Sequence, residues 1–406
     1  MLNVTHCSSK RRVGQIFCHH HREVRHLMKV LIAPDSYKGC LSAIEVAEAI
    51  ERGVLAAVPD AQVDKVPMAD GGEGTVDALL VAIGGKKVPV RVLDPLGREV
   101  ESFYGVTTDG VALIEMAAAS GLPMLDKDER DPLHTTTYGT GQLIRAALEA
   151  GCRHIIIGIG GSATNDGGMG MAQALGAVFR DKGGVIIERG DGESTGLVCD
   201  IDVSGMMPEL SDCVIDVACD VSNPLCGATG ASAVFGPQKG ATPELIAQLD
   251  ANLAHYARVI NACLSRDVAQ IPGAGAAGGL GAGLMAFTNA KLRPGCDIVI
   301  EAARLAERIA QCDLVFTGEG QTDFQTIYGK VPAGIGTVAK SVGVPVVCLS
   351  GAVRHGFEEI YECGVTAALS ITTRPMTLAE SIKRAPVLLE RNARAITRLV
   401  AFKREK

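Results

Sequence analysis

The 406-residue chain contains no tryptophan, and aromatic residues make up only 4% of it. An aromatic-rich β-sandwich is therefore a poor interpretation. Glycine, by contrast, occurs 48 times, which suits the many tight strand-to-helix turns of α/β proteins. With 47% hydrophobic residues, a chain of this length can bury a substantial core, so we expect two folded domains of the α/β class.

Basic stretches and long apolar runs are also missing from the body of the chain. Its formal net charge is −7, so binding to a nucleic-acid backbone has little electrostatic support. No apolar segment approaches the roughly 18 residues that mark a membrane span. We expect a cytoplasmic protein that acts on a small molecule, without nucleic-acid or membrane partners. Whether it forms a homo-oligomer stays open.

The 13 cysteines include no CxxC pair. Several of them, such as Cys152, Cys219 and Cys348, lie within or beside apolar runs. Zinc sites and redox motifs depend on paired spacings that are absent here. Reduced thiols in the protein core are the better interpretation.

Residues 1–27 differ in composition from the rest of the chain. They hold five of the nine histidines, and five lysines or arginines against one glutamate. No apolar stretch follows the basic residues, which argues against a secretory signal. We predict a disordered N-terminal extension and a folded protein that begins at Met28.

From Met28 onward, strand and helix patterns alternate. A buried strand at 29–33 precedes Ser42 and Glu45, whose spacing predicts a capping box at the start of a helix. Similar βα units return beyond residue 313, whereas the segment 101–115 is typical of antiparallel strands. The alternation predicts a parallel sheet with helices on both faces.

Asp94-Pro-Leu-Gly97 is a strong turn signal, which we interpret as a domain boundary. We therefore predict a discontinuous Rossmann/flavodoxin-like domain formed by 28–94 and 290–406. An α+β domain at 95–289 is inserted into it, and we expect the active site in the cleft between the two domains.

Several nucleotide-binding motifs are incomplete. Gly329-Lys330 is followed by Val331, so no Walker A loop forms there. The segment 158–163, GIGGSA, matches a dinucleotide fingerprint between a strand and a helix. An NAD-dependent hydroxy-acid dehydrogenase is therefore the main alternative. However, the loop continues as TNDGG through 164–168, and its polar side chains suit a polyphosphate with Mg²⁺ better.

A second glycine-rich segment, 273–283, follows a proline rather than a clear strand. Its glycines either present amides to an anion or permit close helix packing, and the sequence does not decide between these roles. Acidic residues follow three predicted strands, at Asp35, Asp220 and Glu319. Carboxyl ends of parallel strands meet at one edge of a sheet, so we expect these carboxylates to line the cleft.

Seven stretches, in this order, closely resemble the type I glycerate kinase family: APDSYKGCLSA (33–43), ADGGEGT (69–75), GIGGSATNDGGMGMAQALGA (158–177), CDVSNPLCG (219–227), FGPQKGA (235–241), GAGAAGGLGAGL (273–284) and TGEGQTDFQT with GKVPAG (317–334). The resemblance runs from Met28 almost to the end. It implies a two-domain α/β kinase that transfers the γ-phosphoryl group of ATP to D-glycerate, giving 2-phosphoglycerate. Formation of 3-phosphoglycerate by the same fold and a non-catalytic ligand-binding protein remain alternatives.

Phosphoryl transfer requires positioning and charge neutralisation. We assign Lys38 to the glycerate carboxylate or the γ-phosphate, and Asp166 and Asp220 to Mg²⁺ binding or hydroxyl activation; these three are the predicted catalytic residues. Ser162 and Asn165 are assigned to phosphate contact. Charge neutralisation falls to Lys239 and Lys330. The remaining predicted substrate- or phosphate-binding residues lie in the matching stretches: Asp35, Ser36, Asp70, Gly71, Gly72, Asn223, Gly278, Gly279, Glu319 and Asp323.

Overall fold

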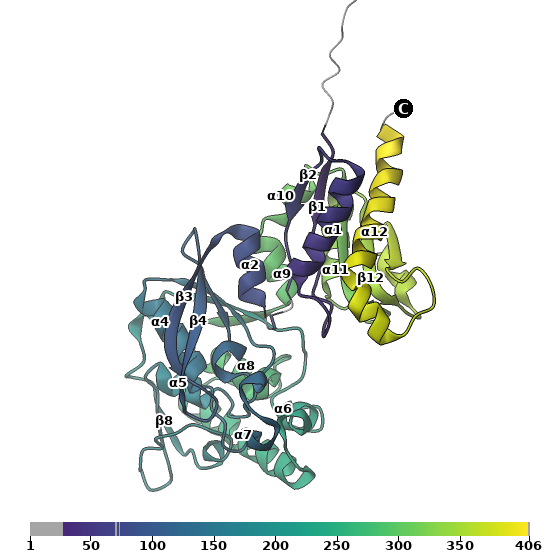
Figure 1. Ribbon diagram of the computed structural model, residues 1–406. Coiled ribbons are helices and arrows are strands. Elements are labelled where there is room, and N and C mark those ends of the chain that lie inside the picture. The colour runs from purple at the N-terminus through teal and green to yellow at the C-terminus, as the bar shows by residue number, and fades with distance from the viewer. Residues whose placement is uncertain (1–26, 70, 73, 405–406) are drawn as a thin grey trace, which may run out of the picture.

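The computed structural model describes residues 27–69, 71–72 and 74–404 (Figure 1). The predicted N-terminal extension, Leu27 apart, lies outside the described residues, as does Asp70. Two β-sheets organise the chain, one in each of the two bodies visible in Figure 1. No helix of the described part is long and apolar enough to cross a membrane.

The first sheet has five parallel strands in the order β13-β12-β11-β1-β2. Its strands are β1 (Lys29–Ile32), β2 (Gln62–Lys65), β11 (Leu314–Thr322), β12 (Val346–Val353) and β13 (Ala367–Ser370). The chain winds in one direction from β1 and in the other from β11. Their carboxyl ends therefore meet at a switch point, where open α/β sheets bind ligands.

Helices cover both faces of this sheet, as predicted. One apolar cluster packs the sheet against α1 (Ala43–Ala57) and α12 (Leu378–Arg404). The other face is covered by α9 (Gly295–Ala302), α10 (Leu305–Ile309) and α11 (Val331–Val342). The predicted capping box at α1 is confirmed: Ser42 Oγ accepts from the Glu45 N–H at 3.2 Å, and Glu45 Oε2 accepts from the Ser42 N–H at 2.8 Å.

The second sheet has six strands in the order β10-β9-β6-β5-β4-β3. Four of these run parallel: β10 (Ala290–Arg293), β9 (Val214–Ala218), β6 (His154–Gly158) and β5 (Ala112–Glu115). Two complete the sheet as antiparallel strands: β4 (Glu99–Thr107) and β3 (Gly85–Leu93). The antiparallel pairing predicted for 101–115 is thus confirmed.

The predicted domain boundaries need correction, because β3 and β10 belong to the six-stranded sheet. The turn at Asp94 is a hairpin turn rather than a linker. Asp94 accepts from the Gly97 N–H through its carbonyl at 3.0 Å and donates its own N–H to the Arg98 carbonyl at 2.8 Å. Strand β3 consequently folds back along β4, and sheet membership changes near residue 84 and near residue 294 instead.

Helices and short segments cover the six-stranded sheet. They comprise α3 (Ala117–Ser120), α4 (Tyr138–Glu149), α5 (Met169–Ala174), α6 (Ala231–Phe235), α7 (Pro243–Leu264), α8 (Ala276–Phe287) and the hairpin β7 (Val178–Arg180) with β8 (Asp200–Asp202). Short 3₁₀ turns lie at Leu122–Met124, Lys127–Glu129, Ser194–Gly196, Pro208–Ser211, Pro237–Lys239 and Phe357–Tyr361.

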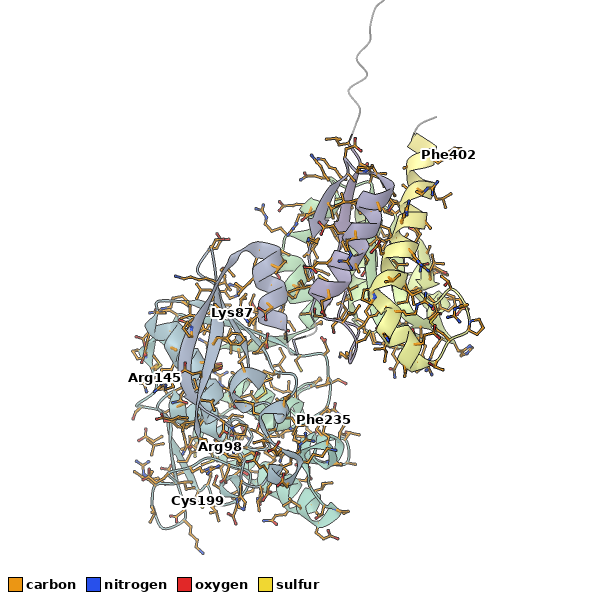
Figure 2. All side chains as sticks on the ribbon, viewed as in Figure 1. Lys87, Arg98, Arg145, Cys199, Phe235 and Phe402 are labelled. Carbon is orange, nitrogen blue, oxygen red and sulfur yellow. The ribbon has the colours of Figure 1, made fainter. Side chains whose placement is uncertain are left out.

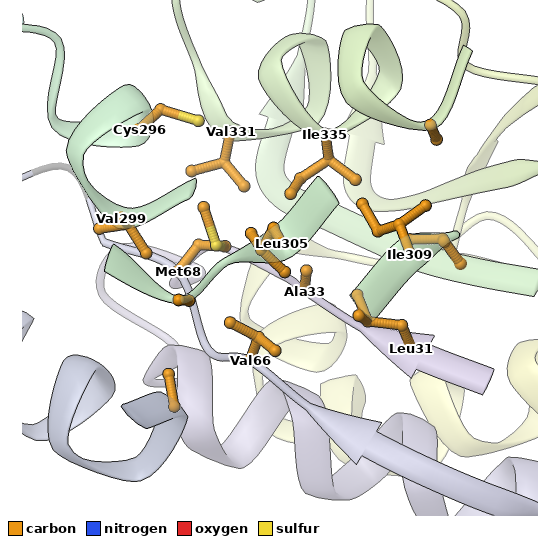
Figure 3. Close-up of a cluster of buried hydrophobic side chains, with 14 of the residues drawn as sticks. Leu31, Ala33, Val66, Met68, Cys296, Val299, Leu305, Ile309, Val331 and Ile335 are labelled. Atoms are coloured by element: carbon orange, nitrogen blue, oxygen red, sulfur yellow. The ribbon is translucent and has the colours of Figure 1, made fainter. Parts of the chain in front are cut away.

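One apolar cluster joins the two sheets. Helix α2 (Thr75–Ile83) and helix α9 pack between them, so Leu113 and Ile156 of the six-stranded sheet belong to the same cluster as Leu31 and Val315 of the five-stranded sheet. Figure 3 shows the part of this cluster in which residues of α9, α10 and α11 pack against β1 and the segment after β2. The shared core fixes how the two sheets face each other.

Candidate active site

A cavity of about 850 Å³ lies between the two sheets. The loop 36–42 after β1 lines one side of it. The other side is lined by the loop 159–162 after β6, the segment 218–221 after β9, and Phe235 of α6, which is labelled in Figure 2. A second cavity, of about 660 Å³, is lined mainly by the carboxyl end of β11 and the start of α11. Both cavities are lined by Ser36, Lys38 and Asp220, so we treat them as one cleft.

Tyr37 anchors the loop after β1 to β12, and it was not selected from the sequence. Its buried hydroxyl donates to the Leu349 carbonyl at 2.7 Å, and burial raises the pKa of this phenol well above its ordinary value. The Asp35 N–H donates to the Gly318 carbonyl at 2.8 Å, which ties the loop to β11. Ser36 and Lys38, on either side of the anchored Tyr37, line the cleft as predicted.

Glu319 lies at the centre of a hydrogen-bond network at the end of β11. Its carboxylate accepts from Thr326 Oγ1 at 2.6 Å, from Thr322 Oγ1 at 3.1 Å and from Lys330 Nζ at 3.2 Å. Asp323, which also lines the cleft, accepts from the Gln321 amide at 2.7 Å and from the Gln325 N–H at 2.9 Å. The structure therefore brings together the three charged residues predicted on this segment.

Asp35 and Asp220 approach the cleft from different sheets. Asp220 follows β9, is exposed, and accepts from the Gly295 N–H at 2.8 Å. Burial, and then the charges of Asp297, Asp220 and Asp35, raise the pKa of the Cys296 thiol. Both cleft carboxylates thus lie within electrostatic reach of one sulfur atom. Within the described residues, no group of three or more histidine, cysteine or acidic side chains is arranged to hold a metal.

Asp166 lies behind the cleft and does not line it, contrary to our prediction. It is fully buried, and four donors saturate its carboxylate: the Thr137 N–H and hydroxyl at 2.8 and 2.7 Å, and the N–H groups of Gly168 and Gly170 at 3.1 and 3.2 Å. Burial raises its pKa, and these hydrogen bonds oppose the rise. The geometry gives Asp166 a structural role, joining the start of α5 to the segment before α4.

Lys239 and Asn165 are also buried behind the cleft rather than in it. Lys239 Nζ donates to Ser162 Oγ at 2.7 Å and to the Thr164 carbonyl at 2.6 Å. The Asn165 amide donates to Ser232 Oγ at 3.0 Å. Of the predicted residues in the loop after β6, Ser162 alone lines the cleft. The polar side chains of this loop mostly bind neighbouring protein groups.

The glycines of the dinucleotide fingerprint serve close backbone packing. The Gly160 N–H donates to the Gly71 carbonyl at 3.1 Å, and a Cβ at Gly158 would lie 2.3 Å from the same oxygen. Residues 71–72 thus pack directly against the backbone of Gly158 and Gly160. Gly72 lines the cleft, whereas Gly71 supports it from behind. The packing therefore explains these glycines without a bound dinucleotide.

The segment 273–283 shows the same kind of packing. A Cβ at Gly278 would lie 1.9 Å from the Thr164 carbonyl oxygen, and one at Gly279 would lie 2.8 Å from Gly167 Cα. Both glycines have positive φ, so they also permit the left-handed start of α8. The side chain of Asn223 donates to the Thr229 carbonyl at 2.8 Å. These three residues therefore support the cleft wall from behind, whereas we had predicted that they bind substrate or phosphate in the cleft.

Phe235, Gln238 and Tyr328 line the cleft but were not selected from the sequence. All three lie within or beside stretches that carry the family resemblance. We favoured charged residues there and chose Lys239 and Lys330 instead. The uncharged neighbours could have been found from the same stretches, because a nucleotide or a hydroxy acid also needs apolar and amide contacts.

The glycerate kinase family model matches residues 30–401 of the chain. The chain belongs to the glycerate kinase family. It is 52% identical over 376 residues to a glycerate 2-kinase of Escherichia coli (strain K12). The alignment covers 92% of this chain and 98% of that protein. It is 49% identical over 368 residues to a glycerate kinase of Halalkalibacterium halodurans, with 90% and 97% covered.

A solved structure supports this membership. The crystal structure of a Salmonella typhimurium LT2 protein assigned as glycerate kinase 2 superposes with a TM-score of 0.84 at 50% identity, and the match covers 94% of this chain and 100% of that one. Membership in the glycerate kinase family confirms the predicted family, the α/β fold and a phosphotransferase activity. It also excludes the dehydrogenase alternative.

Proposed function

We propose that the chain phosphorylates D-glycerate with ATP, releasing 2-phospho-D-glycerate and ADP. The observation that supports this most is the meeting of Lys38, Asp220 and Glu319 in one cleft at the carboxyl ends of three strands. Phosphoryl transfer needs a cation near the anionic substrate, carboxylates that hold a metal or accept the hydroxyl proton, and a site enclosed by two walls. The similar Escherichia coli protein is named a glycerate 2-kinase, which favours transfer to the 2-hydroxyl.

Asp35 and Asp220 fit Mg²⁺ better than Asp166 does. Magnesium in kinases is usually held by one or two carboxylates together with phosphate oxygens and water, so two protein ligands suffice. Both aspartates lie at strand ends facing the cleft, whereas the oxygens of Asp166 are taken by protein donors. When bound, Mg²⁺ would neutralise charge on the phosphates.

The cleft residues themselves supply positioning. Lys38 extends from a loop that Tyr37 anchors, which suits contact with a carboxylate or a phosphate. Lys330 is held by Glu319 at the first turn of α11, so its charge has a fixed place at the edge of the cleft. Asp220 is our candidate for the carboxylate beside the glycerate hydroxyl, either as a ligand of Mg²⁺ or as the acceptor of the hydroxyl proton, because it is exposed and shared by both cavities.

We place the reaction in the cytoplasm. Among the described residues, four buried cysteines, Cys152, Cys213, Cys296 and Cys348, carry free thiols. Reduced core cysteines suit a compartment that keeps thiols reduced and supplies ATP.

The test is phosphorus NMR after incubation of the protein with D-glycerate, ATP and Mg²⁺. We expect ADP and the signal of 2-phosphoglycerate, and a matched reaction with the Asp220→Asn variant should give at least about 100-fold less product. A 3-phosphoglycerate signal would overturn the proposed position of transfer. Absence of ADP formation would overturn the kinase activity itself.

A further inference from the structure

Directly behind Ser162, which lines the cleft, lies Lys239. The residue is 1% exposed, and its two hydrogen-bond acceptors, the Ser162 hydroxyl and the Thr164 carbonyl, are both neutral. Burial of an ammonium group against neutral acceptors is unfavourable, and an apolar side chain would fill the same space without that cost. A lysine in this place therefore points to a role beyond packing.

An ammonium group has only donors, so its bond to Ser162 fixes the polarity of the serine hydroxyl. Ser162 Oγ accepts from Lys239 Nζ at 2.7 Å, and its own proton must be directed elsewhere. Ser162 keeps 7% of its surface exposed, and it lines the cleft. When Lys239 is protonated, the serine can thus donate to a group in the cleft with a positive charge immediately behind it.

The surroundings of Lys239 make its protonation sensitive to charge in the cleft. Burial lowers the pKa of its amine to about 7, and Asp166, the charged neighbour from the loop after β6, opposes that effect. Tyr256 of α7 faces Asp166, and burial followed by that carboxylate raises the pKa of its phenol. An anion hydrogen-bonded to Ser162 would favour the protonated lysine. Binding of such an anion near neutral pH should therefore take up protons.

Two further polar atoms beside these residues are buried and, within the described part of the chain, have no hydrogen-bond partner. They are Thr164 Oγ1 and the Tyr256 hydroxyl. Unsatisfied polar atoms in a buried network lower stability, and each of them calls for an explanation, such as a functional role or a bound water. This is an observation independent of the lysine itself.

We propose that Lys239 is a positioning residue for an anionic group of the substrates, a carboxylate or a phosphoryl group, and that it acts by holding the Ser162 hydroxyl as a donor toward the cleft. The inference rests on the proposed function and deepens it. It changes the role predicted for Lys239 from direct neutralisation to action through Ser162.

The experiment measures binding calorimetrically at pH 7.5, in two buffers that differ in ionisation enthalpy. D-Glycerate and a non-hydrolysable ATP analogue are titrated separately, which distinguishes the carboxylate from the phosphoryl group. The proteins are the wild type, Lys239→Met, Ser162→Ala and the double variant. Lys340→Met is the matched control, because that lysine also donates to a carbonyl, that of Glu362, but lies on the exposed end of α11.

We expect one of the two ligands to bind about 10- to 100-fold more weakly to Lys239→Met, the range for a charge-assisted hydrogen bond. Proton uptake with that ligand should be lost. The double variant should bind it about as weakly as the weaker of the two single variants, because Lys239 acts through Ser162. The Lys340→Met variant should match the wild type.

Affinity of Lys239→Met within twofold of the wild type for both ligands would overturn the proposal, as would additive losses in the double variant. If Lys239→Met does not fold, Ser162→Ala decides: retained proton uptake overturns the proposal, and lost uptake supports it. Product formation by the wild type is measured in parallel. An inactive wild type would contradict the proposed function, whereas the binding data test Lys239 separately.

Discussion

The two walls of the cleft present their polar residues differently. On the wall formed by the five-stranded sheet, Asp35, Lys38, Glu319, Asp323 and Lys330 all line the cleft. On the wall formed by the six-stranded sheet, Ser162 and Asp220 line it, while the polar residues of the loop after Ser162 are buried behind it. The first wall supplies charge directly. The second is a packed polar layer that shapes the surface and exposes few polar side chains to the cleft.

The largest effect that would test this comparison is on catalysis. Replacing Asp220 by Asn keeps the size of the side chain and its acceptor for the Gly295 N–H but removes the negative charge. We expect kcat to fall by about 100-fold or more, since a positioned base contributes 10²–10⁴. The melting temperature should stay near that of the wild type, because Asp220 is exposed.

Steady-state assays and thermal unfolding of the same preparation check this prediction. Turnover within a few-fold of the wild type would remove Asp220 from the mechanism and leave the second wall without a catalytic carboxylate.

Asp166→Asn should produce the opposite pattern. An amide at this position must place its NH₂ group against N–H or O–H donors that now bond to carboxylate oxygens. We expect the free energy of unfolding to fall by about 1–3 kcal/mol, measured by urea denaturation. Turnover per folded molecule should change less than in Asp220→Asn. Normal stability with crippled turnover would restore Asp166 as a catalytic residue.

The buried amine of Lys239 predicts a pH-dependent difference between the walls. The pKa of this amine is about 7 in the folded protein, whereas the ordinary value for a lysine is 10.5. Between these values the unfolded chain binds more protons than the folded one, so stability rises with pH, by up to about 1.4 kcal/mol per unit. The free energy of unfolding of the wild type relative to Lys239→Met should therefore increase from pH 7 toward 10.

Urea unfolding of both proteins at several pH values measures that difference. A flat difference would show that the amine keeps its ordinary pKa.

The smallest expected effect concerns the loop after β1. Gly39 has φ +73°, and no heavy atom outside its neighbours lies within 4 Å of the position that a Cβ would take. Gly39→Ala should therefore lower the free energy of unfolding by only about 1–2 kcal/mol, the cost of a left-handed L-residue. A larger loss in thermal or urea unfolding would show that the first wall is as tightly packed as the second.

Local patterns predicted much of this fold. The capping box at Ser42, the strand before Asp35 and the antiparallel pair at 101–115 depend on neighbouring residues, and the structure has all of them. The turn at Asp94 was predicted too, but not its meaning. A hairpin turn and a domain linker use the same residue types. The difference depends on whether the segments before and after the turn pair as strands.

The candidate site was harder to predict on the second wall. Asp166 lies in a glycine-rich loop after one strand, and Asp220 comes soon after another strand. Nothing in the neighbouring sequence shows which of the two carboxylates is buried. Asp166 packs against Thr137, which lies 29 positions earlier in the chain. The N–H and hydroxyl of Thr137 donate to the Asp166 carboxylate. Lys239 reaches Ser162 across 77 positions. Such long-range hydrogen bonds decide between a ligand contact and a structural contact, and a single sequence does not show them.

The apolar cluster shared through α2 and α9 bears on how the molecule loses its structure. Leu113 of one sheet and Val315 of the other are buried in the same cluster, so disruption of either sheet would expose apolar surface that belongs to both. Two sheets joined in this way are expected to melt in a single cooperative transition, and a fragment containing one sheet would lack part of its own interior.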